Sequence, residues 1–199
     1  VGILFGAMAQ HSRFCRRAAS LDVAEGRLGP RLSIWLIAFS AGVLTVQTLI
    51  ATGLLDVSQS RQLAATGSMS GAIIGGLMFG TGMILARGCA SRLLVLSATG
   101  NLRAIVTGLV LTLVAQSALR GALAPAREAL AALWLVQGGS TRNMLAQFGL
   151  TSTTAATIAA LALGGALWHG RQQQVKASHI VASMGVGLAV GLGWLGTYL

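Results

Sequence analysis

Charged residues are absent from five long stretches of this chain, and these stretches are mostly apolar. They cover residues 32–55, 62–86, 104–119, 143–170 and 177–199. A helix that crosses a membrane needs about 20 consecutive, mainly apolar residues; four of the stretches reach that length, and residues 104–119 nearly do. A shorter apolar segment opens the chain at residues 1–9. The pattern therefore predicts an all-α integral membrane protein with five to six transmembrane helices in a single transmembrane domain, residues 1–199.

The composition supports this fold class and excludes a soluble globular domain. Only 9% of the residues are charged and 54% are hydrophobic, whereas a soluble domain carries about 25% charged residues. The net charge of +10 comes from basic residues that lie almost entirely between the apolar stretches, where membrane proteins carry the residues that set their orientation. No basic segment is interleaved with aromatic residues as nucleic-acid binding requires. We therefore expect the lipid bilayer as a partner, and no nucleic acid.

One apolar segment, residues 93–98, is too short to cross a membrane. It follows the polar sequence that runs from Arg87 to Arg92 and is ended by Gly100 and Asn101. Irregular backbone at membrane depth is tolerated only against protein or a water-filled cavity. We therefore expect a short half-helix or re-entrant segment here, beside a substrate pathway.

Glycine is frequent in the apolar stretches, and some of the 27 glycines are spaced four residues apart. The pairs are Gly71 and Gly75, Gly76 and Gly80, and Gly187 and Gly191. In a membrane, small residues at this spacing let helix backbones approach closely. Most of these glycines are explained by helix packing, but the string through residues 69–86 is denser than packing requires and also fits a helix that bends near a pathway.

An internal repeat contains both cysteines of the chain. Placing Gly2 over Gly76 without gaps gives five identities in fourteen positions. The identical pairs are Gly2 and Gly76, Phe5 and Phe79, Gly6 and Gly80, Arg13 and Arg87, and Cys15 and Cys89. Transporters are commonly built from internal repeats, with the substrate site where the repeats meet. We therefore interpret the two cysteines as substrate-pathway residues rather than as small buried apolar side chains, the other common role of cysteine.

Arginines accompany both cysteines. Arg13 precedes Cys15 by two residues, and Arg87 and Arg92 flank Cys89. These arginines attract anions to the pathway, or they extend along the apolar surface to reach the membrane interface; the sequence favours neither role. Neither cysteine has a histidine or a second cysteine at metal-ligand spacing, so we expect no metal site and no cofactor.

The sequence FGTGMILARGC at residues 79–89, followed by Gly100, Asn101 and Leu102, closely resembles the YeeE/YedE family of bacterial membrane proteins. Residues 2–15 look like that family's first cysteine motif. The resemblance implies a multi-pass thiosulfate transporter of the bacterial inner membrane, built from two pseudo-symmetric halves. Residues 1–170 would form the first half and residues 171–199 the start of the second.

In this family, cysteine thiols are thought to pass the anion along by hydrogen bonds. The resemblance therefore implies that Cys15 and Cys89 are relay residues, with Gly88 and the neighbouring arginines beside the pathway. A third relay cysteine of the family has no counterpart here, and we expect it beyond Leu199. The family usually has a glycine shortly after the second cysteine, where this chain has Ser91 and Arg92; the change affects the constriction or the substrate.

Two other functions stay open. The first is a membrane thiol oxidoreductase or sulfurtransferase that uses the two cysteines, although the sequence has no CxxC pair. The second is a membrane subunit that anchors a soluble cytosolic sulfurtransferase, a partner with which members of the family are thought to cooperate. We favour a transporter that is not an enzyme. The sequence leaves the identity of the sulfur anion, the energy coupling and the oligomeric state undecided.

Overall fold

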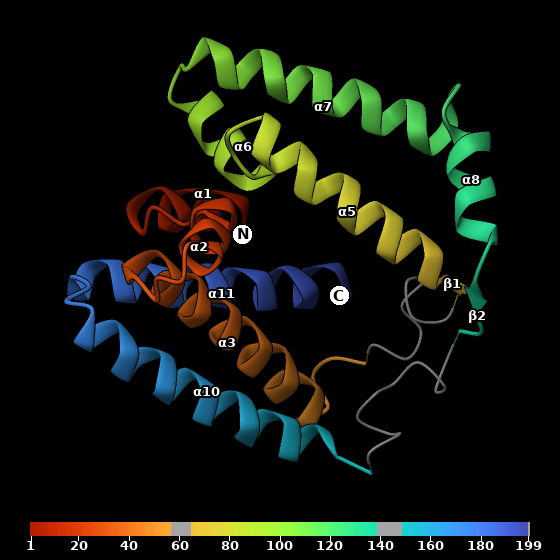
Figure 1. Ribbon diagram of the computed structural model, residues 1–199. Coiled ribbons are helices and arrows are strands. Elements are labelled where there is room, and N and C mark those ends of the chain that lie inside the picture. The colour runs from red at the N-terminus through yellow and green to blue at the C-terminus, as the bar shows by residue number, and fades with distance from the viewer. Residues whose placement is uncertain (57–64, 139–148, 199) are drawn as a thin grey trace. The chain divides into compact units, whose positions relative to one another are not determined.

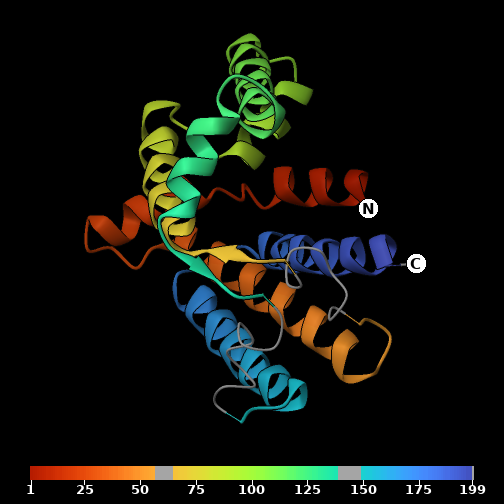
Figure 2. The same ribbon diagram turned by 90° about the vertical axis from the view of Figure 1, so that its right-hand side faces the viewer.

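The computed structural model describes residues 1–56, 65–138 and 149–198, and nearly all of their regular structure is helical (Figure 1). The helices are α1 (Gly2–His11), α2 (Arg16–Ala24), α3 (Pro30–Ala51), α5 (Met69–Leu85), α6 (Ala90–Ala98), α7 (Leu102–Arg120), α8 (Ala124–Ala132), α10 (Ser152–Gln172) and α11 (Ala177–Tyr198). Two short strands, β1 (Gly67–Ser68) and β2 (Leu135–Val136), pair antiparallel with Gly67 opposite Val136 (Figure 2). The predicted all-α membrane fold is confirmed.

The number of membrane-spanning helices is lower than predicted. In the described part of the chain, α3, α7 and α11 are long and apolar enough to cross a membrane, and α5 with α6 makes a fourth span if this pair, bent by 41°, is counted as one. The main error is the span expected in the charge-free stretch at residues 143–170, of which residues 143–148 lie outside the described residues. Helix α10 has sufficient length, 21 residues, but hydroxyl side chains fill its first turn and His169 and Arg171 lie in its last, which lowers its hydropathy.

The chain divides into two compact units. Unit 1 comprises Val1–Val57 and Asn143–Leu199, and unit 2 comprises Ser58–Arg142. Unit 1 therefore contains α1, α2, α3, α10 and α11, while unit 2 contains the strands and α5 to α8. The expected division at residue 170 concerns the two repeat halves of a longer transporter, and it stays a prediction.

Helix α3 is the centre of unit 1, because it packs against both α10 and α11 (Figure 1). Ile37 is fully buried and forms a core cluster with Ala41 of α3 and with Leu163 and Ala166 of α10. One turn after Ala166 in α10, a Cβ added at Gly170 would lie 3.7 Å from Cβ of Ser33, which is one turn before Ile37 in α3. The two helices therefore run antiparallel and pack through small and branched side chains.

The backbones of helices α3 and α11 approach so closely that only glycine fits at the contact. A Cβ added at Gly187 would lie 2.6 Å from the carbonyl oxygen of Ala38 and 2.6 Å from the amide nitrogen of Gly42. One turn further along, a Cβ at Gly191 would overlap the side chain of Thr45. The predicted packing role of this glycine pair is therefore confirmed. Helix α1 packs along α11 as well, with Met8 against Gly185.

In unit 2, the strand pair connects α5 to α8. The hydroxyl of Ser68 donates to the carbonyl oxygen of Ala131 at 2.6 Å, and that of Ser70 donates to the carbonyl oxygen of Leu130 at 2.8 Å. The side chain of Ser68 also accepts from the backbone N–H of Gly71 and so caps α5. These bonds satisfy carbonyls near the end of α8 that the helix leaves without intrahelical partners.

The predicted short helix after Cys89 is confirmed as α6, nine residues long. Within the described residues, only the first glycine of the α5 string is closely packed: a Cβ added at Gly71 would lie 2.9 Å from the hydroxyl oxygen of Ser68 and 3.7 Å from Cβ of Ala131. A Cβ at Gly75, Gly76, Gly80 or Gly82 would meet nothing within 4 Å. The bend at the α5–α6 junction lies after this string rather than inside it.

We expect Gly187→Ala to destabilise the protein, because the added methyl group would collide with the backbone of α3. Overpacking of this kind costs about 1–3 kcal/mol, which thermal unfolding in detergent would detect as a lower midpoint temperature. Gly193→Ala is the matched control in the same helix, since its Cβ would lie 3.8 Å from Val1, an ordinary contact. Equal midpoints for the two variants would contradict the close α3–α11 contact.

Candidate functional site

The two cysteines lie in segments whose local structure repeats as their sequences do. Helix α1 ends at His11 and α5 ends at Leu85, and each is followed by a three-residue turn, a cysteine and a nine-residue helix. The offset of 74 that places Gly2 over Gly76 also converts the bounds of α2, residues 16–24, into those of α6, residues 90–98. The repeat is therefore structural as well as sequential.

The first turn closes α1 with the hydrogen bonds of a Schellman motif. The backbone N–H of Arg13 donates to the carbonyl of Gln10 at 3.2 Å, and that of Phe14 donates to the carbonyl of Ala9 at 3.1 Å. These bonds satisfy carbonyls at the end of the helix that would otherwise lack partners. The chain then leaves the helix at Cys15 in extended conformation.

The second turn repeats this pattern at the end of α5. The backbone N–H of Arg87 donates to the carbonyl of Ile84, and that of Gly88 donates to the carbonyl of Met83, both at 3.2 Å. Each donor and acceptor is 74 residues beyond its counterpart in the first turn. Cys89 follows in extended conformation, as Cys15 does.

Arg13 and Arg87 occupy the position of these turns that favours glycine. Their φ angles are 54° and 53°, in the left-handed region that costs about 1–2 kcal/mol for a residue with a side chain. Strained residues of this kind are concentrated at functional sites. Gln174, between α10 and α11, has the same φ of 53°, so the turn geometry alone does not define a site. What sets the first two turns apart is the arginine at this position and the cysteine that follows.

Each cysteine is the N-cap of its short helix, and neither helix receives a side-chain capping bond. Helices α1, α3 and α8 also lack such a bond, whereas Ser68, Asn101 and Thr151 cap α5, α7 and α10 by accepting from a backbone N–H of the first turn. The first N–H groups of a helix have no intrahelical partner and carry the positive end of the helix dipole. A thiol replaces the capping oxygen at α2 and α6, so the N–H groups there can bind an anion.

We use the term cysteine station for a cysteine together with the turn before it and the first turn of the helix after it. The first station contains Arg13 and Cys15 and belongs to unit 1. The second contains Arg87, Gly88, Cys89 and Arg92 and belongs to unit 2. Each station brings its own members together, and neither cysteine forms a disulfide.

The two stations differ in packing. Cys89 is buried, with 3% of its surface exposed, and its sulfur lies 3.4 Å from the hydroxyl oxygen of Ser91. Gly88 is also buried, and a Cβ added there would lie 3.3 Å from Cδ2 of Leu93. Cys15 is half-buried. Arg13 and Arg87 are exposed, whereas Arg92 is half-buried.

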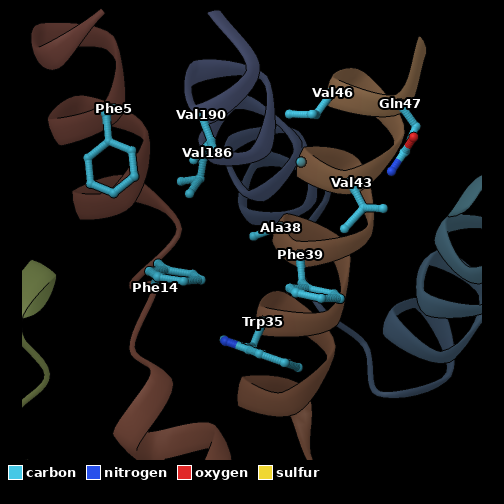
Figure 3. Close-up of a pocket in the computed structure, with 11 residues that line it drawn as sticks. Phe5, Phe14, Trp35, Ala38, Phe39, Val43, Val46, Gln47, Val186 and Val190 are labelled. Atoms are coloured by element: carbon cyan, nitrogen blue, oxygen red, sulfur yellow. The ribbon is translucent and has the colours of Figure 1, made fainter. Parts of the chain in front are cut away.

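A cavity of about 480 Å³ lies within unit 1, next to the first station (Figure 3). Phe5 and Phe14 line one side, and residues of α3 and α11 line the rest. Phe14 belongs to the turn that precedes Cys15. The lining is almost entirely apolar and offers polar side-chain atoms only from Trp35 and Gln47. A doubly charged anion would lose its solvation there without compensation, so the cavity does not fit the anion-binding role of the stations.

Sequence reasoning singled out Ser91, the second residue of α6, and overlooked its counterpart in α2, Arg17. The internal repeat could have identified this pair, since the offset of 74 residues places position 17 over position 91. Within residues 1–56, 65–138 and 149–198, no three His, Cys, Asp or Glu side chains come together as metal ligands.

The chain matches known proteins of one kind. Residues 11–194 match the model of a protein family described as sulphur transport. Over 91 residues the chain is 32% identical to the thiosulfate transporter TsuA of Spirochaeta thermophila. That alignment covers 46% of this chain and 26% of the relative, so the matched region is about a quarter of the relative's length.

We expect Arg87→Gly to stabilise the protein, because glycine adopts the left-handed conformation without the penalty of a side chain. The gain should reach about 1 kcal/mol after the extra freedom of glycine in the unfolded chain is subtracted. Thermal unfolding in detergent measures it. Ala86→Gly is the control: Ala86 has an ordinary helical φ of −72°, so this change should destabilise by about 0.5–1 kcal/mol. A similar loss in both variants would show that the turn is not strained at Arg87.

Proposed function

Since this chain belongs to the sulphur transport family, we propose that it carries thiosulfate or a related sulfur-containing anion across the bacterial inner membrane. The observation that supports this most directly is the cysteine station, repeated at an offset of 74 residues. Each station combines a thiol, a helix N-terminus without a side-chain cap, and an arginine.

These groups suit an anion that must leave water. A dianion that enters a membrane needs hydrogen-bond donors to replace its hydration. Backbone N–H groups and the helix dipole supply them at α2 and α6, and the thiols of Cys15 and Cys89 add weak donors. The exposed guanidinium groups of Arg13 and Arg87 attract the anion to the stations, and Arg92 adds a further positive charge at the second.

Weak donors also favour passage. Conduction requires binding that is strong enough for entry and weak enough for release, over several sites. A thiol holds an anion less tightly than a second guanidinium would, because it carries no charge. Cys15 and Cys89 therefore act as relay residues, with Gly88 leaving room beside the second thiol. A cytosolic sulfurtransferase is the partner that would consume the imported sulfur.

We expect liposomes that contain the full-length protein to take up labelled thiosulfate, and Cys89→Ala to abolish this uptake. The alanine removes the thiol donor from the buried interior of the second station. Ser97→Ala, which removes a half-buried hydroxyl in the last turn of the same helix, is the control and should retain wild-type uptake. Wild-type uptake by Cys89→Ala at equal protein levels would refute the relay role.

An enzyme mechanism makes a different prediction. An oxidoreductase or sulfurtransferase would leave a disulfide between the cysteines or a persulfide on one of them, whereas a relay leaves both thiols unmodified. We expect the intact mass of the protein to be unchanged after incubation with thiosulfate. A gain of one sulfur atom or a loss of two hydrogens would favour the enzyme. Copurification of a sulfurtransferase in the absence of any uptake would favour the anchoring subunit.

A further inference from the structure

We propose that the apolar cavity of unit 1 is a groove that holds one acyl chain of an anionic phospholipid, with the phosphate of the lipid at the end of the groove near Trp35. The cavity is too apolar for the transported anion, so its occupant is of another kind. This inference goes beyond anion transport and does not depend on it.

The cavity follows one face of α3. The residues of α3 that line it recur every three or four positions, the spacing of a single helix face: Trp35, Ala38, Phe39, Gly42, Val43, Val46 and Gln47. From the first of these residues to the last, the helix rises about 18 Å at about 1.5 Å per residue. One leaflet supplies about 15 Å of the hydrocarbon core. Since α3 is a candidate membrane span, the groove lies along the bilayer and is about as long as the acyl chains of one leaflet.

The other walls of the groove suit a hydrocarbon chain. Aromatic and branched side chains face it from α1, from the turn after α1 and from α11: Phe5, Phe14, Val186 and Val190 (Figure 3). On α3, the rings of Trp35 and Phe39 stack with their centroids 5.2 Å apart. The volume of about 480 Å³ is in the range of sites that take small molecules. An acyl chain would supply the van der Waals contacts that an empty cavity lacks, and lipid chains are the apolar molecules present at this depth.

The helix directions bring four helix ends together at the Trp35 end of the groove. Helix α11 runs parallel to α3, because Gly187 and Gly191 meet successive turns of α3. Helix α1 runs antiparallel to both: its last residue, His11, lies against His179 near the start of α11, with ring centroids 5.7 Å apart. Helix α10 is antiparallel to α3 as well. The ends of α1 and α10 and the starts of α3 and α11 therefore lie on one side of unit 1.

This side of unit 1 is strongly basic. Among the described residues of unit 1, all charged side chains except that of Asp56 lie in or next to the segments that connect α1 to α3 and α10 to α11. Two are acidic, Asp22 and Glu25. Seven are basic: Arg13, Arg16, Arg17, Arg27, Arg31, Arg171 and Lys176.

The excess of positive charge selects the headgroup. Basic clusters at the ends of membrane-spanning helices bind the phosphates of anionic lipids. A phospholipid whose chain lies in the groove would place its headgroup at this end, one turn beyond Trp35, a residue type that is common at membrane interfaces. Charge complementarity therefore favours an anionic lipid over a zwitterionic one. Phe14 directly precedes Cys15, so the bound chain would pack beside the first cysteine station.

The test begins with native mass spectrometry of the full-length protein in a mild detergent. Phosphatidylglycerol is the anionic probe, and phosphatidylethanolamine with the same acyl chains is the zwitterionic one. We expect one phosphatidylglycerol molecule to stay bound to the wild-type protein, with about tenfold preference over phosphatidylethanolamine that falls as salt is added. Equal binding of the two lipids would overturn the headgroup assignment. If no phospholipid binds, as expected where another segment of the full-length protein fills the groove, the proposal fails.

A variant that fills the groove locates the acyl chain. Val46→Trp places a large side chain in the lining and should lower phosphatidylglycerol binding by about tenfold or more, because the chain loses apolar burial. Val181→Trp is the matched control, since it makes the same change at an exposed residue of α11 outside the lining, and it should bind as the wild type does. Equal binding by the two variants would overturn the proposal.

Fluorescence gives a second measurement that does not require the groove to be filled. Brominated phosphatidylglycerol quenches an indole that it contacts, so it should quench part of the wild-type emission in detergent. Trp35→Phe keeps an aromatic ring and should lose this quenching, whereas Trp168→Phe, an exposed position of α10, should keep it. Undiminished quenching in Trp35→Phe would overturn the proposal. None of these measurements involves uptake, so their failure would leave the proposed transport function standing.

Discussion

Backbone hydrogen bonding is the constraint on which this structure depends. In a membrane, each N–H and C=O group must find a partner within the protein, and a helix provides one for all but its ends. The helix ends are therefore the places where backbone groups remain available to bind a ligand. In the two repeated segments, the Schellman turns satisfy the carbonyls that end α1 and α5, while the N–H groups that begin α2 and α6 receive no side-chain cap. One end of each junction is closed, and the other is where we propose that the anion binds.

The arginines of the turns follow from the same constraint. A Schellman turn requires one residue in left-handed conformation, and glycine would adopt it at the lowest cost. Arg13 and Arg87 occupy it instead, which places an exposed positive charge two residues before each cysteine. If the anion binds at these turns as we propose, the strained arginines trade stability for positive charge at the binding site, a trade that functional sites commonly make.

The two units use glycine in different ways. In unit 1, Gly187 allows the backbones of α3 and α11 to meet, and this contact holds the helix on which α10 also packs. In unit 2, the glycines of α5 after Gly71 have open space around them within the described residues. The spacing is the same in both helices, so the sequence pattern shows that close approach is permitted and not whether a neighbour uses it.

The sequence by itself determined the membrane fold, the short helix after Cys89 and the equivalence of the two cysteines. These features depend on local composition and on identities at a constant offset, which need no knowledge of packing. The tertiary structure decided the rest. Helix α10 is not apolar enough to be counted as a membrane span, because its hydropathy depends on where the helix begins and ends. The burial of Arg17 Nε depends on the side chains that surround it. Which side chains meet the thiol at a helix N-terminus is a property of three-dimensional packing, and only the structure reveals it.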